Sequence, residues 1–319
     1  MVLIITSTFD DECDAVVKEL KRFAPNSYFR LNADRLYDYY KLEIDLSTAT
    51  FHLKHKKTGK SIQSKQIRKV WWARYELPGA TFEWFDKDLS GFIDDEYYSS
   101  LIAIQACLDK KNTPTINHPI RNNIGGHKPY QQLVAKSCGF NLPEQLITND
   151  TYAFIKTPWH QNSVYKPISN SQYLTKNKNK YFATVKEINE NLLDRIKTEA
   201  TELYIHHFQQ KLEVKKEYRV TVFGNHVFAF RIDGKYGFDW RQYLEKIKYT
   251  FIPDFQLSQS CIDYLKEMGI QMGCFDFIQT PEGKFYFLEC NAPGFFMFCD
   301  PRSKYGLAKA FAEFLIQKS

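Results

Sequence analysis

Two apolar segments near the end of the chain, each interrupted by one carboxylate, constrain the fold more than any other feature. Residues 273–279 read GCFDFIQ and residues 284–291 read KFYFLECN, with Thr-Pro-Glu-Gly between them. Aromatic-rich runs on both sides of a short Pro/Gly turn predict a β-hairpin. A carboxylate without a partner inside such an apolar strand costs several kcal/mol. The hairpin must therefore bring a positive partner to its carboxylates.

The alternation of side chains along a strand suggests what that partner is. Glu289 and Asn291 project to the same side of their strand, and the tight turn brings Asp276 of the paired strand close to Glu289. Two carboxylates and an amide oxygen form an oxygen-only site, which is what Mg²⁺ prefers. We predict that these three residues bind Mg²⁺. The alternative is that the carboxylates are ordinary solvated strand residues.

A second hairpin is predicted upstream, where Gly224-Asn225 separates the runs 217–223 and 226–232. Arg219 and Arg231 lie inside these apolar runs and are expected to face one another in the hairpin register, or nearly so. Planar guanidinium groups match phosphate oxygens in pairs. Two arginines beside Glu217 leave positive charge unmatched, which favours a catalytic role over the alternative, a structural ion pair.

The rest of the chain alternates short strands with helices. The first hundred residues predict a small α/β domain, and the polar segment 110–123 is the first domain boundary. A helix over 128–138 is expected to end at Gly139, and Thr184 with Glu187 resembles a capping box for a helix that continues to Thr198. Further elements are predicted at residues 2–6, 11–22, 28–31, 41–62, 70–72, 94–109, 145–147, 163–168 and 307–316.

Four motifs in this order resemble the ATP-grasp ligases, over roughly residues 117–315. They are the Lys128 helix leading to Pro143, the Val-Tyr-Lys-Pro segment at 164–167, Glu-Tyr-Arg-Val at 217–220, and the carboxylate hairpin ending in Glu-Cys-Asn-Ala-Pro-Gly. Trp-Trp-Ala-Arg at 71–74, Phe-Gln at 208–209 and the strand at 226–232 narrow the resemblance to the microviridin or graspetide peptide macrocyclases.

The resemblance implies a mixed α/β and α+β chain with the ATP-grasp fold. It implies an N-terminal α/β pre-ATP-grasp domain over residues 1–115, a central lobe over 116–202, and a C-terminal lobe with the metal site over 203–319. ATP would lie in the cleft between the last two lobes.

The resemblance also assigns roles to single residues. Lys128 and Lys166 would neutralise ATP phosphates. The segment 204–209 would hold adenine, chiefly through backbone groups, and Glu213 would accept hydrogen bonds from the ribose hydroxyls. The loop 169–182 would cover the phosphates, although it contains no glycine. Its lysines are either solvated or reach the nucleotide, and both alternatives stay open. The residues assigned to adenine are His206, His207, Phe208 and Gln209, of which the two histidines could instead be ordinary polar surface residues.

The implied function is an ADP-forming ligase that uses ATP and Mg²⁺ to activate a carboxylate as an acyl phosphate. Its substrate would be a ribosomally made precursor peptide with a leader segment, in which Asp or Glu side chains are joined to Ser, Thr or Lys side chains. A homodimer is expected. Two alternatives stay open: a ligase that adds a free amino acid to a protein or small-molecule carboxylate, and an ATP-binding regulatory protein without turnover.

Composition excludes several other classes. The seven cysteines include no Cys-x-x-Cys pair, so neither a disulfide framework nor a zinc site is indicated. The net charge of +6 is mild, and the densest basic cluster, Lys176, Lys178 and Lys180, is too short to indicate a nucleic-acid partner. The start of the sequence lacks the basic region of a signal peptide, and no apolar run reaches the ~18 residues of a membrane span. We expect a cytoplasmic enzyme.

Overall fold

The computed structural model describes residues 1–75, 77, 90–168, 172–174, 180–182, 185–198, 205–234, 247–292 and 294–317. Most of the predicted phosphate-covering loop, including Lys176 and Lys178, lies outside these ranges. Thr184 and residue 204 also lie outside them. The side chain of Lys180 is also outside the description.

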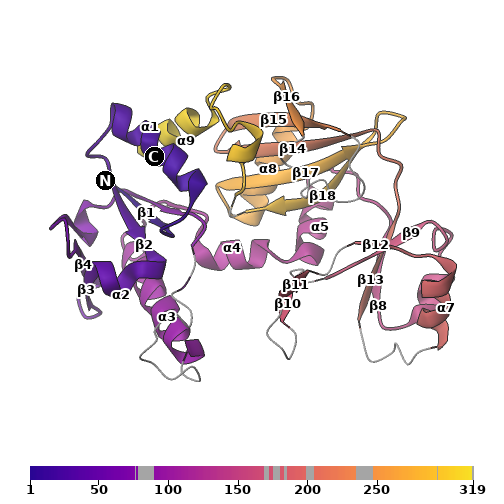
Figure 1. Cartoon of the computed structure of the whole chain (residues 1–319), viewed down its shortest axis with the longest axis horizontal. Helices are drawn as coiled ribbons and strands as arrows, with labels where there is room; N and C mark the ends of the chain where they lie inside the picture. Colours follow the sequence, from indigo (N-terminus) through magenta and orange to yellow (C-terminus); the bar gives the residue numbers. More distant parts are fainter. Residues whose placement is uncertain are drawn as a thin grey trace.

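The N-terminal part is a parallel sheet of order β2-β1-β6-β7 with helices on both faces (Figure 1). Alternate residues of β1 enter two different cores: Leu3 and Ile5 pack in the core that α3 covers, while Val2 and Ile4 pack in the core that contains α1. This explains why β1 is an unbroken apolar run. The elements are β1 Val2–Thr6, α1 Asp11–Phe23, β2 Tyr28–Asn32, β6 Lys69–Trp72, α3 Ser90–Asp109 and β7 Thr115–Ile116.

A small antiparallel sheet is inserted between β2 and β6. It contains the hairpin expected in the region 41–62 and one further short strand, in the order β3-β4-β5. The short helix α2, Leu36–Tyr39, precedes it. The strands are β3 Tyr40–Asp45, β4 Thr50–His55 and β5 Ser61–Gln63.

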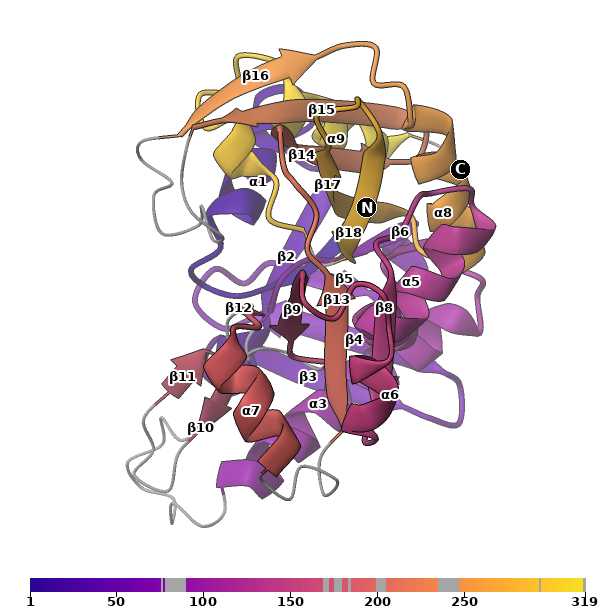
Figure 2. The same ribbon diagram turned by 90° about the vertical axis from the view of Figure 1, so that its right-hand side faces the viewer.

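The central part is a four-stranded sheet of order β12-β9-β13-β8, which lies below the C-terminal sheet in Figure 2. Its core is formed by Phe154, Ile188 and Phe208, and the rings of Phe154 and Phe208 stack at 3.8 Å. The elements are α4 Pro119–Gly125, α5 Lys128–Ser137, β8 Gln145–Thr148, α6 Thr151–Ile155, β9 Ser163–Lys166, β12 Lys186–Glu187, α7 Glu190–Thr198 and β13 His206–Gln210; β10 Gln172–Leu174 and β11 Lys180–Phe182 form a separate hairpin.

The predicted capping box at Thr184 and Glu187 is wrong. Glu187 lies in β12, where it pairs with Val164 of β9, and the helix begins only at Glu190. Asn189 caps it instead, since its Oδ1 accepts a hydrogen bond from the backbone N–H of Leu192 at 2.9 Å.

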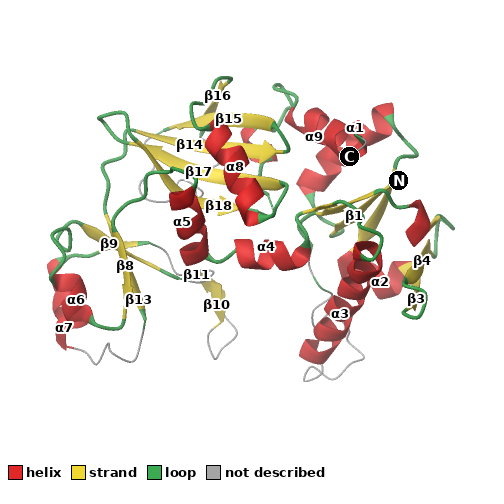
Figure 3. Ribbon diagram, turned by 180° about the vertical axis from the view of Figure 1, so that it is seen from behind, coloured by secondary structure: helices red, strands yellow, loops and turns green. Residues whose placement is uncertain are grey.

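The C-terminal part is an antiparallel sheet of order β16-β15-β14-β17-β18, and both predicted hairpins are confirmed in it. Helices α5 and α8 cover one face (Figure 3), while α9 and α1 pack against the other. The elements are β14 Lys216–Phe223, β15 His226–Asp233, β16 Lys248–Ile252, α8 Ser258–Met268, β17 Met272–Gln279, β18 Phe285–Asn291 and α9 Leu307–Ile316.

The two ends of the chain meet, because α9 lies beside α1 in Figures 1 and 3. One continuous core contains Val16 and Leu20 of α1, Phe311 of α9 and Phe230 of β15. In addition, Lys69 Nζ donates to the carbonyl oxygens of Phe314 and Gln317 at 3.0 and 3.1 Å, which satisfies the end of α9. The N-terminal sheet is therefore packed firmly against the C-terminal sheet. No helix in the described ranges is both long and apolar enough to cross a membrane.

Candidate functional site

A β-bulge places the predicted metal ligands on one face of the C-terminal sheet. Phe277 pairs with Phe287 in the apolar core, whereas Asp276 pairs with Glu289, so one extra residue of β18 lies between the two pairs. Without this irregularity Glu289 would point the same way as Phe287, into the core. The bulge turns Glu289 to the face of Asp276 and Asn291, as bulges near functional sites often do.

Arg219 is the positive partner of Asp276. The two residues are directly opposite on β14 and β17, and Arg219 Nη1 donates to both carboxylate oxygens at 2.8 Å. Arg219 is 4% exposed and Asp276 9% exposed, so this is a buried ion pair. Burial opposes the charge on Arg219, but the Asp276 carboxylate outweighs it, and the pKa of the guanidinium is raised.

Lys128 supplies the second positive charge, 3.7 Å from Glu289. It begins α5, and α5 is attached along the edge strand β18 by side chains that complete the strand's backbone hydrogen bonds. Gln131 accepts from the N–H of Cys290 and donates to its carbonyl oxygen, both at 2.9 Å. Gln132 donates to the carbonyl oxygen of Leu288 at 2.7 Å. These bonds fix the helix so that its first residue lies beside Glu289.

A second polar group lies on the central sheet. Lys166 and His207 are opposite one another on β9 and β13, and Lys166 Nζ donates to Gln209 Oε1 at 2.8 Å. His207 Nε2 contacts Gln145 Oε1 at 3.1 Å, and Gln145 in turn donates to Gln132 of α5 at 3.1 Å. A chain of hydrogen bonds therefore connects this face of the central sheet to the edge of β18.

The comparisons with known proteins identify structures with a similar fold. The family model of the MvdD pre-ATP grasp domain matches residues 1–119. A RiPP-associated ATP-grasp ligase of Chryseobacterium gregarium, solved with ADP and a leader and core peptide, superimposes with a TM-score of 0.85 at 25% identity, over 100% of this chain and 97% of that one. This chain resembles the RiPP ATP-grasp ligases. By that likeness it is an enzyme with the ATP-grasp ligase fold.

More distant structures share the fold. The macrocyclase MdnC of Microcystis aeruginosa MRC, bound with precursor peptide MdnA, gives a TM-score of 0.81 at 20% identity, covering 100% of this chain and 99% of that one. D-alanyl-alanine synthetase A of Vibrio cholerae gives 0.57 at 13% identity, covering 99% and 97%. A search of curated protein sequences gave no match.

The candidate site contains a set of oxygen ligands that fits a divalent cation, although the prediction of a metal from the burial of the carboxylates needs revision. Arg219 and Lys128 already compensate Asp276 and Glu289, so burial alone does not require a metal. No three His, Cys, Asp or Glu side chains gather for a metal anywhere in the described ranges. A cation here would take two carboxylates, the amide oxygen of Asn291, and oxygens from phosphate or water, which is an arrangement typical of Mg²⁺.

Asn291 must turn its amide to take part. Its Nδ2 donates to Asp276 Oδ2 at 3.3 Å and to Glu289 Oε1 at 3.4 Å. The amide nitrogen of Asn291 thus faces the two carboxylates, where the amide oxygen would have to lie in order to bind a metal. A rotation of the amide group by half a turn exchanges the nitrogen and the oxygen.

The side chain of His207, in the candidate site, is held neutral. Burial, followed by the charges of Lys166 and Lys128, lowers its pKa to about 4. Its Nδ1 and the Nε2 of Gln209 are buried and have no hydrogen-bond partner within the part of the chain that the structure describes. Buried polar atoms rarely stay unpaired, so a ligand acceptor and donor are the expected partners here.

Residues 204–209 were expected to bind adenine through their backbone groups, but this expectation does not hold for residues 207–209. β13 is an inner strand, and these residues pair with β8 on one side and β9 on the other, which occupies their backbone groups. The side chain of Phe208 is fully buried against Phe154 and cannot reach a ligand. His206 also lies in β13 and is buried, so it is not a surface residue. Glu213 is exposed on the connector between the two sheets.

Arg231 is on the wrong face for the predicted role. The tight turn pairs Phe223 with His226, which aligns Arg219 with Phe230 and Arg231 with Tyr218. Neighbouring residues of a strand point to opposite faces, so Arg231 and Arg219 point away from one another. Arg231 instead forms an ion pair with Asp233, at 2.5 Å between Nε and Oδ1.

The sequence reasoning missed the residues by which other parts of the chain hold this site. Asn117, in the segment before α4, accepts from Met272 N–H at 3.0 Å and donates to the Ala292 carbonyl, so it fixes the start of β17 beside the end of β18. Glu12 of α1 contacts the segment just after β18. A helix-terminal acid and a lone asparagine give no such signal in the sequence.

Proposed function

We propose that the protein is an ATP- and Mg²⁺-dependent ligase that activates carboxylates of a ribosomally made precursor peptide and joins them to hydroxyl or amino side chains. The observation that carries the proposal is the convergence of Asp276, Glu289 and Asn291 with Arg219 and Lys128 on one face of the sheet. When bound, ATP would supply the phosphoryl group that makes the carboxylate reactive, and Mg²⁺ would neutralise phosphate charge.

Side chains of both the central and the C-terminal lobe would bind the nucleotide and the cation. Lys166 and Lys128 are both close enough to lower the pKa of His207, and together they provide the positive charge that a triphosphate needs. Asp276 and Glu289 would hold the cation. Arg219, anchored by Asp276, would stabilise negative charge on a transferring phosphoryl group.

Adenine is assigned to the connector after β13. Leu212, Glu213 and Val214 lie outside the strand ladders, so their backbone groups are available to a ligand in a way that those of residues 207–209 are not. Glu213 is exposed there and is retained as the acceptor for the ribose hydroxyls. His207 Nδ1 and Gln209 Nε2, on the central sheet, add one acceptor and one donor.

The precursor peptide is proposed from the relatives. The Chryseobacterium ligase was solved with a leader and core peptide, and MdnC with its precursor peptide. Whether esters or amides form depends on the peptide, and a homodimer stays a prediction.

The test uses the purified protein with ATP, Mg²⁺ and a synthetic peptide encoded by a short reading frame beside its gene. We expect the peptide to lose one water for each bond formed, and heavy oxygen placed in its carboxylates to appear in the released phosphate. Asp276→Asn should abolish both signals, whereas Glu282→Gln, in the exposed turn of the same hairpin, should leave them unchanged. ADP release with free glutamate, glycine or cysteine, but not with the peptide, would favour an amino-acid ligase instead. ATP that stays bound and intact with every substrate would indicate a regulatory protein.

A further inference from the structure

The segment that follows β18 has an unfavourable backbone conformation, which contacts with other residues must stabilise. Phe295 has φ of +128°, which a residue with a side chain rarely adopts, and Gly294 before it has φ of +95°. Such conformations persist where surrounding contacts fix them, and they concentrate at functional sites. The carbonyl oxygen of Phe295 accepts a hydrogen bond from Arg219 Nη2 at 2.9 Å.

Glu12, from the other end of the sequence, holds this segment. Its Oε1 accepts hydrogen bonds from the backbone N–H groups of Phe296 at 2.5 Å and Met297 at 3.2 Å. Burial raises the pKa of Glu12 to about 7, although both of these hydrogen bonds lower it. The adjoining Gly294 leaves room for the carboxylate, since a Cβ there would lie 3.3 Å from Glu12 Oε2.

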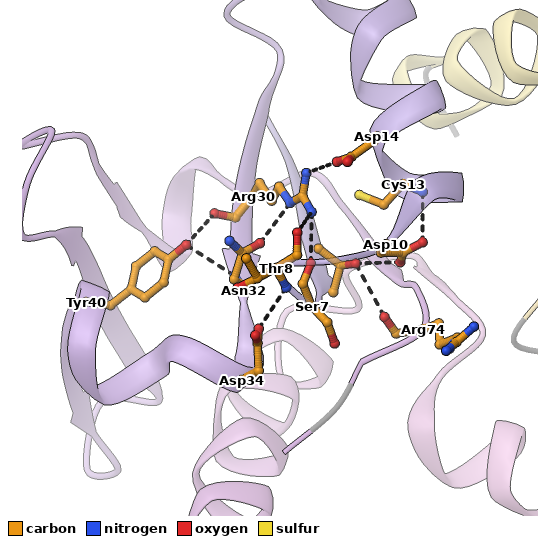
Figure 4. A network of polar contacts seen from close by, with 11 residues as sticks. Ser7, Thr8, Asp10, Cys13, Asp14, Arg30, Asn32, Asp34, Tyr40 and Arg74 are labelled. Atoms are coloured by element: carbon orange, nitrogen blue, oxygen red, sulfur yellow. Dashed lines mark hydrogen bonds and ion pairs between the residues drawn. The ribbon is translucent and has the colours of Figure 1, made fainter. Parts of the chain in front are cut away.

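Glu12 can act as a fixed point because the start of α1 is held rigidly. Asp10 caps the helix by accepting from Cys13 N–H at 3.0 Å (Figure 4). Its other carboxylate oxygen accepts from the Thr6 hydroxyl at 2.6 Å. Cys13 is fully buried in the core shared by α1, α9 and the C-terminal sheet. On the outer side, the guanidinium of Arg74 lies 4.5 Å from the ring centre of Phe295.

Arg219 therefore has two anchors, and one of them depends on Glu12. Asp276 fixes Nη1, and the Phe295 carbonyl fixes Nη2. With only the first anchor, the guanidinium could rotate about its contact with Asp276. The direction of its remaining N–H groups toward a phosphate would then no longer be fixed.

We propose that Glu12 is a positioning residue for Arg219: by holding residues 294–297, the N-terminal domain completes the phosphate site of the C-terminal lobe. The kinetic part of this inference rests on the proposed function. The orientation of Arg219 does not, because it can be measured without a substrate.

The first test measures Arg219 by NMR in nucleotide-free protein labelled at the arginine guanidinium nitrogens. In the wild type, Arg219 Nε–H is buried and should exchange slowly with water. Glu12→Ala should accelerate this exchange, and Glu12→Gln, which keeps an acceptor oxygen, should have a smaller effect. Asp11→Asn, an exposed carboxylate change on the same helix turn, is the matched control and should have none. Unchanged exchange in Glu12→Ala would overturn the inference.

The second test measures turnover in the same variants. Loss of a supporting residue of this kind typically costs about 10–100-fold, and we expect Glu12→Ala to lose this in kcat while KM for ATP and the melting temperature change little. Glu12→Gln should recover part of the loss. A variant with wild-type kcat, or one whose loss appears only in melting temperature, contradicts the proposal. If the wild type shows no turnover with any substrate, the proposed function fails, while the exchange measurement still decides the role of Glu12.

Discussion

Replacing Asp276 by asparagine removes the charge that compensates Arg219 while keeping the shape of the side chain. Arg219 is only 4% exposed, and both Asp276 oxygens are 2.8 Å from Nη1. Removing one partner of a buried pair costs about 3–5 kcal/mol, because a buried charge is left without compensation. The amide retains one oxygen for Nη1, so the lower end of that range applies.

The assay is thermal unfolding without nucleotide, followed by fluorescence or calorimetry. A loss of about 3 kcal/mol corresponds to a fall of roughly 6–12 °C at about 2–4 °C per kcal/mol for domains of this size class. The matched control is Glu282→Gln, whose carboxylate is exposed in the turn of the same hairpin and should leave the melting temperature unchanged.

A double variant separates stability from catalysis. Arg219→Met with Asp276→Leu replaces both charges by apolar groups, which in buried pairs is often neutral or stabilising. We expect most of the melting temperature to return, while ATP-dependent turnover stays absent because the proposed metal ligand and the proposed phosphate-binding guanidinium are both removed. A single Asp276→Asn variant as stable as the wild type would refute the reasoning, since it would mean that water, not the carboxylate, compensates Arg219.

Three further predictions concern residues around the site. Arg231→Gln should leave kcat and KM unchanged, since Arg231 faces away from Arg219 and pairs with Asp233; a marked loss of turnover would count against the observed register. His207 should titrate by NMR near pH 4 rather than near its usual 6.5. Its contribution to folding stability is then fully present above pH 6.5 and is lost as the pH falls toward 4, because the unfolded chain takes up the proton first; a midpoint at the usual value would contradict its burial. Gly273→Ala should lower the free energy of unfolding by about 1–3 kcal/mol, measured by urea denaturation, because the new Cβ would lie 2.6 Å from Cys290 Sγ; unchanged unfolding would show that the core beside β17 can yield.

The two hairpins of the C-terminal sheet could be predicted from the sequence because their signals are local, whereas its edge strand β16 was not predicted. Each hairpin combines aromatic strands with a short turn, and those features act between residues that are close along the chain. The convergence of Asp276 with Glu289 was predicted for the same reason. The bulge at residue 288 was not, and without it the alternation after Phe287 would have sent Glu289 into the core.

The errors arose where one residue of register, or a distant part of the chain, decides the outcome. Arg219 pairs with Phe230, so the register differs by one residue from the one that would pair Arg219 with Arg231. A difference of one residue in register places each side chain of a strand on the opposite face of the sheet. β13 was expected to offer its backbone to adenine, but it is an inner strand whose neighbours come from sequence far upstream. Glu12 is more than two hundred and fifty residues from its partner Phe296, and no local pattern in the sequence could show that contact.

The most direct test of the account is calorimetric titration of the purified protein with ATP, with and without Mg²⁺. We predict saturable ATP binding that depends on Mg²⁺, is strongly weakened in Asp276→Asn and is unchanged in Arg231→Gln. If the wild type takes up no ATP in the presence of Mg²⁺, or binds it equally well after Asp276 is replaced, the assigned site is wrong.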